Sequence, residues 1–180
     1  MLSFVTGYKD DIRLLSESGI KALRLSISWT RIFPTGEEET PNEQGLKFYD
    51  DLFTECRKYG IDPVVTLCHF DVPIPLIQKY GSWRSRKLIS LYEKYASTVF
   101  SRYRDLVKYW LTFNEVNMIT HIPYLGGGLL VDKDDPDFNQ IVYNAAHNQL
   151  PASACAVWEL ALLCEAAAAA AVRTLPVCAL

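Results

Sequence analysis

Apolar positions along this chain alternate between two spacings, one typical of amphipathic helices and the other typical of β-strands. The first such unit joins "YKDDIRLLSESGI" to "KALRLSISW". The former predicts a helix whose buried face carries Ile12, Leu14 and Leu15 and which stops near Gly19. The latter alternates apolar and polar side chains, so the helix leads directly into a strand.

Two further units follow the same plan. "TPNEQGLKFYDDLFTECRKYG" opens with Thr40, Pro41 and Glu43, the spacing of a capping box with proline at the first helical position. "DPVVTLCHF" is then the continuous apolar run expected of a buried strand. "RKLISLYEKYASTVFSRYRDL" predicts the next helix, "VKYWLTFNE" predicts the next strand, and a last helix is predicted to begin near Phe138. The helical faces expected in the core comprise Leu46, Tyr49, Leu52, Phe53, Cys56, Leu88, Leu91, Tyr92, Tyr95 and Val99.

Helices that alternate with buried strands are typical of βαβ units around a parallel sheet. The strands begin near Leu23, Val64 and Tyr109, and this wide spacing favours a β/α barrel with loops over a compact doubly wound sheet. A closed barrel needs eight such units and roughly twice this length. We therefore expect an α/β fold that forms part of a TIM (β/α)8 barrel.

The composition and charge of the chain exclude several classes of protein and of binding partner. With 180 residues, a net charge of -3 and 49% hydrophobic residues, the chain is long and apolar enough for one globular core. Its Lys and Arg residues are scattered, so we expect neither nucleic acid nor a membrane as partner. The segment "MLSFVTGYKDD" lacks the features of a secretion signal, which favours a cytoplasmic location. Five cysteines without a CxxC pair favour free thiols, and we expect no metal and no cofactor.

Polar residues stand at the ends of the predicted strands, where a β/α barrel carries its chemistry. Arg24 lies in the first strand, His69 ends the second, and Asn114 and Glu115 end the third. Each has an ordinary structural explanation: a hydrogen-bonded imidazole for His69, an ion pair for Arg24, and a capping or surface carboxylate for Glu115. Their joint position at successive strand ends favours a shared functional site.

Four segments, "LRLSISWTRIFPTG", "VVTLCHFDVP", "YGSWRSRK" and "YWLTFNEVN", resemble the N-terminal half of glycoside hydrolase family 1 in order and spacing. The resemblance implies about strands two to four of a TIM barrel, in the style of the bacterial 6-phospho-β-glucosidases. It implies that Glu115 is the general acid/base, that Asn114 and His69 bind sugar hydroxyls, and that Arg24 orients the nucleophile. The implied substrate is a small-molecule β-glucoside phosphorylated at the 6-position, and a β-glucosidase or β-galactosidase of the same family is the alternative.

A retaining glycosidase explains why a carboxylate follows the uncharged Asn114. One protonated carboxyl gives its proton to the leaving oxygen, and an ionised carboxylate about 5 Å away attacks the anomeric carbon. Glu115 would hold the proton, which requires a raised pKa from burial and from the like charge of the second carboxylate. The resemblance places the nucleophile in a later Glu-Asn-Gly sequence that these 180 residues do not contain. We therefore expect a truncated enzyme that is inactive alone, and the alternative is a partial barrel without a catalytic role.

The composition changes abruptly after Leu150, where "PASACAVWELALLCEAAAAAAVRTLPVCAL" is rich in Ala, Leu and Cys and no longer resembles the family. We divide the chain into a partial glycosidase barrel over 1–150 and an aberrant Ala-rich tail over 151–180. A frameshifted or misassembled gene end is favoured over a genuine helix-forming apolar tail. Pro151 supports this interpretation, because proline is expected to interrupt a helix that continues from Leu150.

Overall fold

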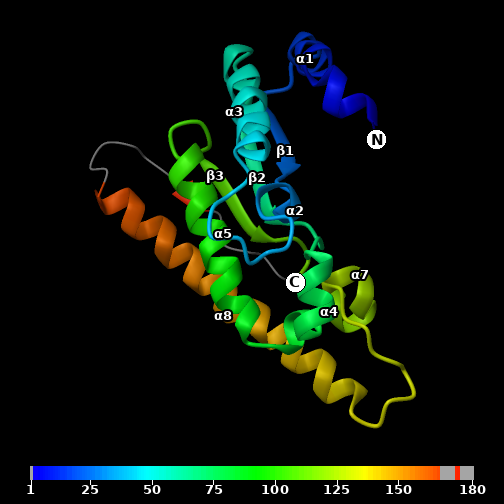
Figure 1. Cartoon of the computed structure of the whole chain (residues 1–180). Helices are drawn as coiled ribbons and strands as arrows, with labels where there is room; N and C mark the ends of the chain where they lie inside the picture. Colours follow the sequence, from blue (N-terminus) through cyan, green and yellow to red (C-terminus); the bar gives the residue numbers. More distant parts are fainter. Residues whose placement is uncertain (1, 167–172, 175–180) are drawn as a thin grey trace.

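The computed structural model describes residues 2–166 and 173–174. Helices and strands alternate along them, as Figure 1 shows. The elements are α1 (Leu2–Glu17), β1 (Ala22–Ser26), α2 (Trp29–Ile32), α3 (Glu43–Lys58), β2 (Asp62–Cys68), α4 (Ile74–Tyr80), the 3-10 helix η1 (Ser82–Arg84), α5 (Lys87–Tyr103), β3 (Tyr109–Phe113), α6 (Met118–His121), α7 (Pro123–Gly127), α8 (Phe138–Ala166) and β4 (Arg173–Thr174). The three helix-and-strand units predicted from the periodicity, and the helix beginning at Phe138, are confirmed.

The strands form one parallel sheet in the order β1-β2-β3-β4. Leu25 pairs with Val65, and Val65 pairs with Trp110, so the first three strands lie in register. In a β/α barrel, neighbouring strands follow one another along the chain with helices between them, and this sheet has that arrangement. The expected partial barrel is confirmed. The carboxyl ends of the strands point towards α2, α4 and α7 (Figure 1).

The two faces of the sheet differ in burial. On the helix-covered face, Trp110 is 2% exposed and packs edge to face on Phe100 of α5, with ring centroids 5.0 Å apart. Successive strand residues point to opposite faces. On the other face, Ala22, Arg24 and Ser26 of β1 are all exposed. The face that lines the inside of a barrel is therefore open along β1.

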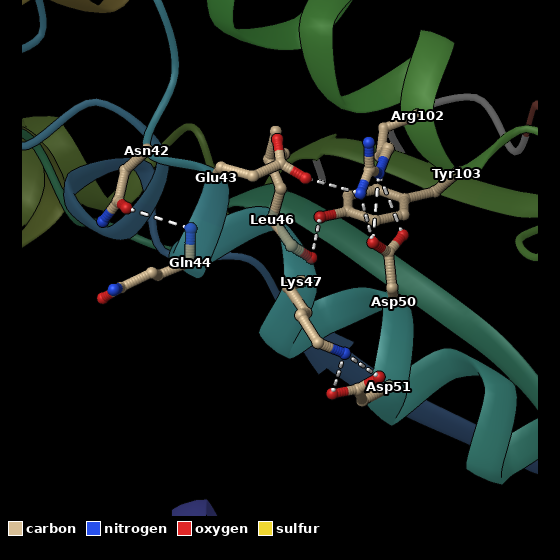
Figure 2. A network of polar contacts seen from close by, with 9 residues as sticks. All are labelled: Asn42, Glu43, Gln44, Leu46, Lys47, Asp50, Asp51, Arg102 and Tyr103. Atoms are coloured by element: carbon tan, nitrogen blue, oxygen red, sulfur yellow. Dashed lines mark hydrogen bonds and ion pairs between the residues drawn. The ribbon is translucent and has the colours of Figure 1, made fainter.

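Helices α3 and α5 are joined by the polar network in Figure 2. Arg102 reaches the carboxylate of Asp50 through Nε and Nη2 at 2.6–3.1 Å, and its Nη2 reaches Glu43 at 2.8 Å. The buried Tyr103 hydroxyl donates to the carbonyl oxygen of Leu46 at 2.8 Å. These contacts fix the two helices against each other.

The buried faces predicted for α3 and α5 are confirmed, but two details of the predicted helices are wrong. Asn42, rather than Thr40, caps α3, because the helix begins at Glu43 and the Asn42 side chain accepts a backbone N–H hydrogen bond at 3.1 Å. In α1, Ile12 is fully buried whereas Leu14 is 50% exposed. Positions two apart point to different sides of a helix, so the two residues do not share a face.

Helix α8 continues through Pro151 to its end, so the prediction that Pro151 interrupts the helix is wrong. Beyond the proline, Ala152, Ala156 and Leu160 are buried. This spacing of four places them on one side of the helix, against α5 and β3. Packing therefore outweighs the backbone hydrogen bond that proline removes.

The segment beyond residue 150 also contacts the sheet directly. The hydroxyls of Ser153 in α8 and Thr112 in β3 lie 2.7 Å apart. The short strand β4, which the periodicity did not predict, pairs with Tyr109 and Trp110 of β3. The division of the chain at residue 150 stays a prediction, and much of the predicted tail, residues 167–172 and 175–180, lies outside the described residues.

Candidate active site at the carboxyl ends of the strands

Arg24 of β1 reaches across the sheet to the ends of β2 and β3. Its Nη2 donates to Oδ1 of Asn114 at 2.7 Å, and its Nε and Nη2 each lie 3.2 Å from Oγ1 of the buried Thr66. Arg24 and Asn114 are 90 residues apart in the sequence. The fold thus brings two of the predicted site residues into direct contact.

His69 and Asn114 occupy equivalent positions on neighbouring strands. Each directly follows the last residue of its strand, Cys68 in β2 and Phe113 in β3, and these last residues are register partners. The Asn114 N–H donates to the carbonyl oxygen of Cys68 at 2.9 Å, which extends the hydrogen-bond ladder by one step. His69 and Asn114 therefore share one edge of the sheet, as predicted.

Glu115 stands at a sharp turn. Its φ is +38°, a left-handed conformation that is uncommon for a residue with a side chain, and Phe70 after His69 has φ +71°. Both strands therefore end in a polar residue followed by a left-handed one, and such backbone outliers cluster at active sites. The Glu115 side chain is exposed. The described residues do not supply the burial expected for a proton donor.

His69 lines two surface pockets. The first, of about 270 Å³, is lined by Arg24, Leu25, Ser26 and His69. The second, of about 360 Å³, is lined by His69, Phe70, Asp71, Val72, Ile74, Ile77, Tyr124, Leu125 and Gly128. Within it, Ile74 and Tyr124 are each 65% exposed. The site therefore has a polar side beside Arg24 and a more apolar side towards α4 and α7.

Buried tyrosine hydroxyls hold the strand ends from the helix side of the sheet. Tyr49 of α3 contacts the segment after β1, Tyr95 of α5 contacts the ends of β1 and β2, and Tyr92 of α5 donates to the carbonyl oxygen of Thr112 in β3. Burial raises the pKa of all three hydroxyls above the usual value for tyrosine. The Tyr92 and Tyr95 hydroxyls therefore stay protonated at neutral pH and donate, whereas the Tyr49 hydroxyl accepts from the Ser28 N–H at 2.8 Å.

The sequence analysis missed Asp71, which lies two residues after His69. Its Oδ2 accepts a hydrogen bond from the Trp29 N–H at 2.7 Å. Burial raises the pKa of the Asp71 carboxyl, while the hydrogen bonds from the Trp29 N–H and the Ser28 side chain act in the opposite direction. An acid so close to a strand-end histidine in "CHFD" was the available signal.

Neither a group of metal ligands nor a membrane-spanning helix is found in the part of the chain that the structure describes. Within residues 2–166 and 173–174, no three His, Cys, Asp or Glu side chains gather as metal ligands. No helix in that part of the chain is long and apolar enough to span a bilayer. Cys56, Cys68 and Cys155 carry free thiols.

Comparisons with known proteins agree with one another. The sequence profile of glycosyl hydrolase family 1 matches residues 3–172. Aryl-phospho-beta-D-glucosidase BglH of Bacillus subtilis (strain 168) is 54% identical over 156 residues, which are 87% of this chain and 33% of the relative. 6-phospho-beta-glucosidase AscB of Escherichia coli (strain K12) is 54% identical over 153 residues, which are 85% of this chain and 32% of the relative. The chain thus spans about a third of the length of these relatives.

Solved structures show the same likeness in three dimensions. A family 1 β-glucosidase from Thermotoga maritima superposes with a TM-score of 0.77 at 33% identity, over 88% of this chain and 35% of the other. A β-glucosidase from Thermotoga maritima in complex with glucoimidazole gives a TM-score of 0.76 at 31% identity, with the same coverage.

Proposed function

The chain belongs to glycosyl hydrolase family 1, and from this premise we propose that its strand-end site takes part in the retaining hydrolysis of β-glucosides phosphorylated at the 6-position. The main observation behind this proposal is the hydrogen bond from Arg24 to Asn114, which joins two site residues from separate strands beside Glu115. The substrate class is supported by the relatives, which are named as phospho-β-glucosidases and are 54% identical to this chain.

The contact with Arg24 orients the Asn114 side chain for sugar binding. Because Oδ1 accepts from the guanidinium at 2.7 Å, the amide nitrogen is the group left to donate. We assign its hydrogen bond to the sugar 2-hydroxyl, a contact that strengthens as the oxocarbenium-like transition state forms. An amide performs this role without adding a second negative charge beside Glu115.

Arg24 retains donor capacity after binding its neighbours. Its Nε and Nη2 are engaged by Thr66 and Asn114, whereas Nη1 has no hydrogen-bond partner within the described part of the chain. A guanidinium holds a carboxylate ionised through charge-assisted hydrogen bonds. We therefore assign Arg24 to orienting the nucleophilic carboxylate, and we assign His69, which lines the same pocket, to binding sugar hydroxyls.

Glu115 supplies half of the acid and nucleophile pair. It gives its proton to the leaving oxygen and then accepts one from the water that hydrolyses the glycosyl-enzyme. A second carboxylate must stand about 5 Å away on the opposite side of the anomeric carbon. The Glu-Asn-Gly sequence expected to carry it does not occur among the 180 residues. We infer that these residues alone bind the glycoside without cleaving it.

A graft tests this assignment. Residues of this chain replace the matching third of Bacillus subtilis BglH, which supplies the remaining strands, and hydrolysis of an aryl 6-phospho-β-glucoside is measured. We expect the graft to be active and its Glu115→Gln variant to lose activity by about 10²-fold or more, because general acid catalysis typically contributes that much. Equal activity of the two grafts would refute Glu115 as the acid. Addition of azide provides the matched control, because a retaining enzyme without its acid/base forms the β-glycosyl azide, whereas one without its nucleophile forms the α-anomer.

The isolated chain tests the remainder of the proposal. We expect no hydrolysis from the folded 180 residues, and activity that disappears in Glu115→Gln would show that the chain contains its own nucleophile. The unphosphorylated β-glucosidase alternative is supported by the Thermotoga maritima structures. Preferential binding of the unphosphorylated glycoside by the isolated chain would favour that alternative. A cytoplasmic location stays a prediction.

A further inference from the structure

The ends of β1 and β2 stay joined beyond the last step of their ladder. The ladder finishes where the Ile27 N–H donates to the carbonyl oxygen of Thr66 at 3.0 Å. Past that point, the buried Tyr95 hydroxyl of α5 lies 2.9 Å from the carbonyl oxygen of Leu67 and 3.3 Å from that of Ile27. A hydroxyl has one hydrogen, so it donates mainly to the nearer Leu67 and holds Ile27 through the weaker contact.

A second link lies further along both strands. The Asp71 carboxylate, in the segment after β2, accepts the Trp29 N–H of the segment after β1 at 2.7 Å. This distance lies at the short end of the range for an N–H to oxygen hydrogen bond. Trp29 is itself fully buried and stacks on the Tyr95 ring, with centroids 5.4 Å apart. The two links therefore share one packed unit behind the site.

His69 lies midway between the two links in the sequence. Leu67 precedes it by two residues and Asp71 follows it by two, while Phe70 between them holds a φ of +71°. A left-handed conformation at a phenylalanine persists only where its surroundings fix it. The His69 side chain itself is exposed and makes no hydrogen bond to the described residues. Its location is therefore set by the backbone on either side and by the Phe70 ring, whose centroid lies 5.2 Å from that of the imidazole.

We propose that Tyr95 and Asp71 are positioning residues for His69, fixing the backbone before and after it and so setting where the imidazole lies beside Arg24. The proposal rests on the assignment of the strand ends to sugar binding. Neither residue touches the pocket beside Arg24, which is lined by Arg24, Leu25, Ser26 and His69. They act through the main chain of β1 and β2.

Tyr103 provides a matched control on the same helix. Like Tyr95, it is fully buried, and its hydroxyl donates to a main-chain carbonyl, that of Leu46 at 2.8 Å. It lies eight residues further along α5, about 12 Å away along the axis, and faces α3 rather than the strand ends. Removing either hydroxyl loses one buried hydrogen bond, but only Tyr95→Phe releases the segment that carries His69.

The test follows the His69 imidazole in ¹⁵N-labelled full-length chain by nuclear magnetic resonance. The chain has three histidines, so variants of the other two assign the His69 resonances. We expect Tyr95→Phe and Asp71→Ala to displace these resonances and Tyr103→Phe to leave them in place. Asp71→Asn keeps an oxygen that accepts from the Trp29 N–H, and we expect it to restore most of the parent position. We expect the Trp29 amide to exchange with solvent roughly fivefold faster in Asp71→Ala, as the loss of one hydrogen bond implies.

Two results would overturn the proposal. One is a His69 signal that moves no more in Tyr95→Phe than in Tyr103→Phe. The other is equal displacement by Asp71→Asn and Asp71→Ala. If Asp71→Ala fails to fold by circular dichroism, Tyr95→Phe decides the matter, because it removes a single hydroxyl. Failure of the proposed function is separate: it would appear as an unperturbed His69 when an aryl 6-phospho-β-glucoside is added to the parent chain.

Discussion

Gly45 lets α3 approach α2 closely, and its replacement by alanine should destabilise the chain. A Cβ at this position would lie 2.2 Å from the carbonyl oxygen of Arg31 in α2 and 3.0 Å from the carbonyl carbon. That oxygen also accepts a hydrogen bond from Nδ2 of Asn42, the residue that caps α3, at 3.2 Å. The new methyl group would therefore meet main chain that is already fixed by a cap.

The size of the effect depends on two opposing contributions. Alanine favours a helix over glycine by about 1 kcal/mol. Against this, an overpacked contact costs about 1–3 kcal/mol, and a displaced Arg31 carbonyl loses a hydrogen bond worth about 1 kcal/mol. Because the contact falls well inside the van der Waals distance and involves backbone, we expect the clash to dominate. Gly45→Ala should lower the free energy of unfolding by about 1–3 kcal/mol.

Gly7 provides the matched control. It is also a helical glycine, in α1, but an added Cβ there would meet nothing within 4 Å. We expect Gly7→Ala to raise the free energy of unfolding by about 0.5–1 kcal/mol, because only the helix propensity changes. Urea titration monitored by tryptophan fluorescence measures both variants, with an unchanged slope required for a change in stability. A Gly45→Ala chain as stable as the parent would refute the close approach of α2 and α3.

Two further predictions concern buried ionisable groups. At pH 8 we expect iodoacetamide to modify Cys155 in the folded chain before Cys56. Burial raises the pKa of the Cys56 thiol to about 11, so roughly a thousandth of Cys56 is present as the reactive thiolate. Equal rates of modification, measured by peptide mapping, would contradict the burial of Cys56. The pKa of the Asp71 carboxyl is raised in the folded state, so its protonated form stabilises the fold. This contribution to stability is fully present below the unfolded-state pKa of about 3.9 and is lost as pH rises through the folded-state pKa. The stability of the parent relative to Asp71→Asn should therefore fall in urea titrations as pH rises above about 4. A pH-independent difference would contradict the raised pKa of Asp71.

The periodicity predicts the long elements well because each buries one regular face. The short helices α2, α4, α6 and α7 were not predicted, since four to seven residues are too few to display a helical repeat. At Pro151 the error is the reverse, because a break was predicted where the structure has a continuous helix. A local rule predicts a break, yet Ala156 and Leu160 beyond it are buried, and packing keeps the helix intact. Local propensity is a weak guide wherever tertiary contacts are strong.

The candidate site was predicted from topology and resemblance rather than from local sequence. The carboxyl ends of parallel strands share an edge, which is why Arg24 and Asn114 were expected to lie together despite their separation in the chain. The contact with Thr66 was not foreseen, because an apolar strand gives no sign of which hydroxyl faces an arginine. The hydrogen bond between Asp71 and the Trp29 N–H was missed for a similar reason, because a main-chain donor carries no mark in the sequence.

Of the residues that we propose for the site, Asn114 is held in place more completely than Glu115. Asn114 is 9% exposed and its amide is already oriented by Arg24, so the sugar contact that we propose for it needs no rearrangement of this pair. Glu115 is exposed at the end of a sheet whose inner face is open along β1. In the graft, the added strands therefore have to close the site around Glu115 rather than realign Asn114. Sugar binding should consequently appear in the isolated chain, and catalysis only where the inner face is covered.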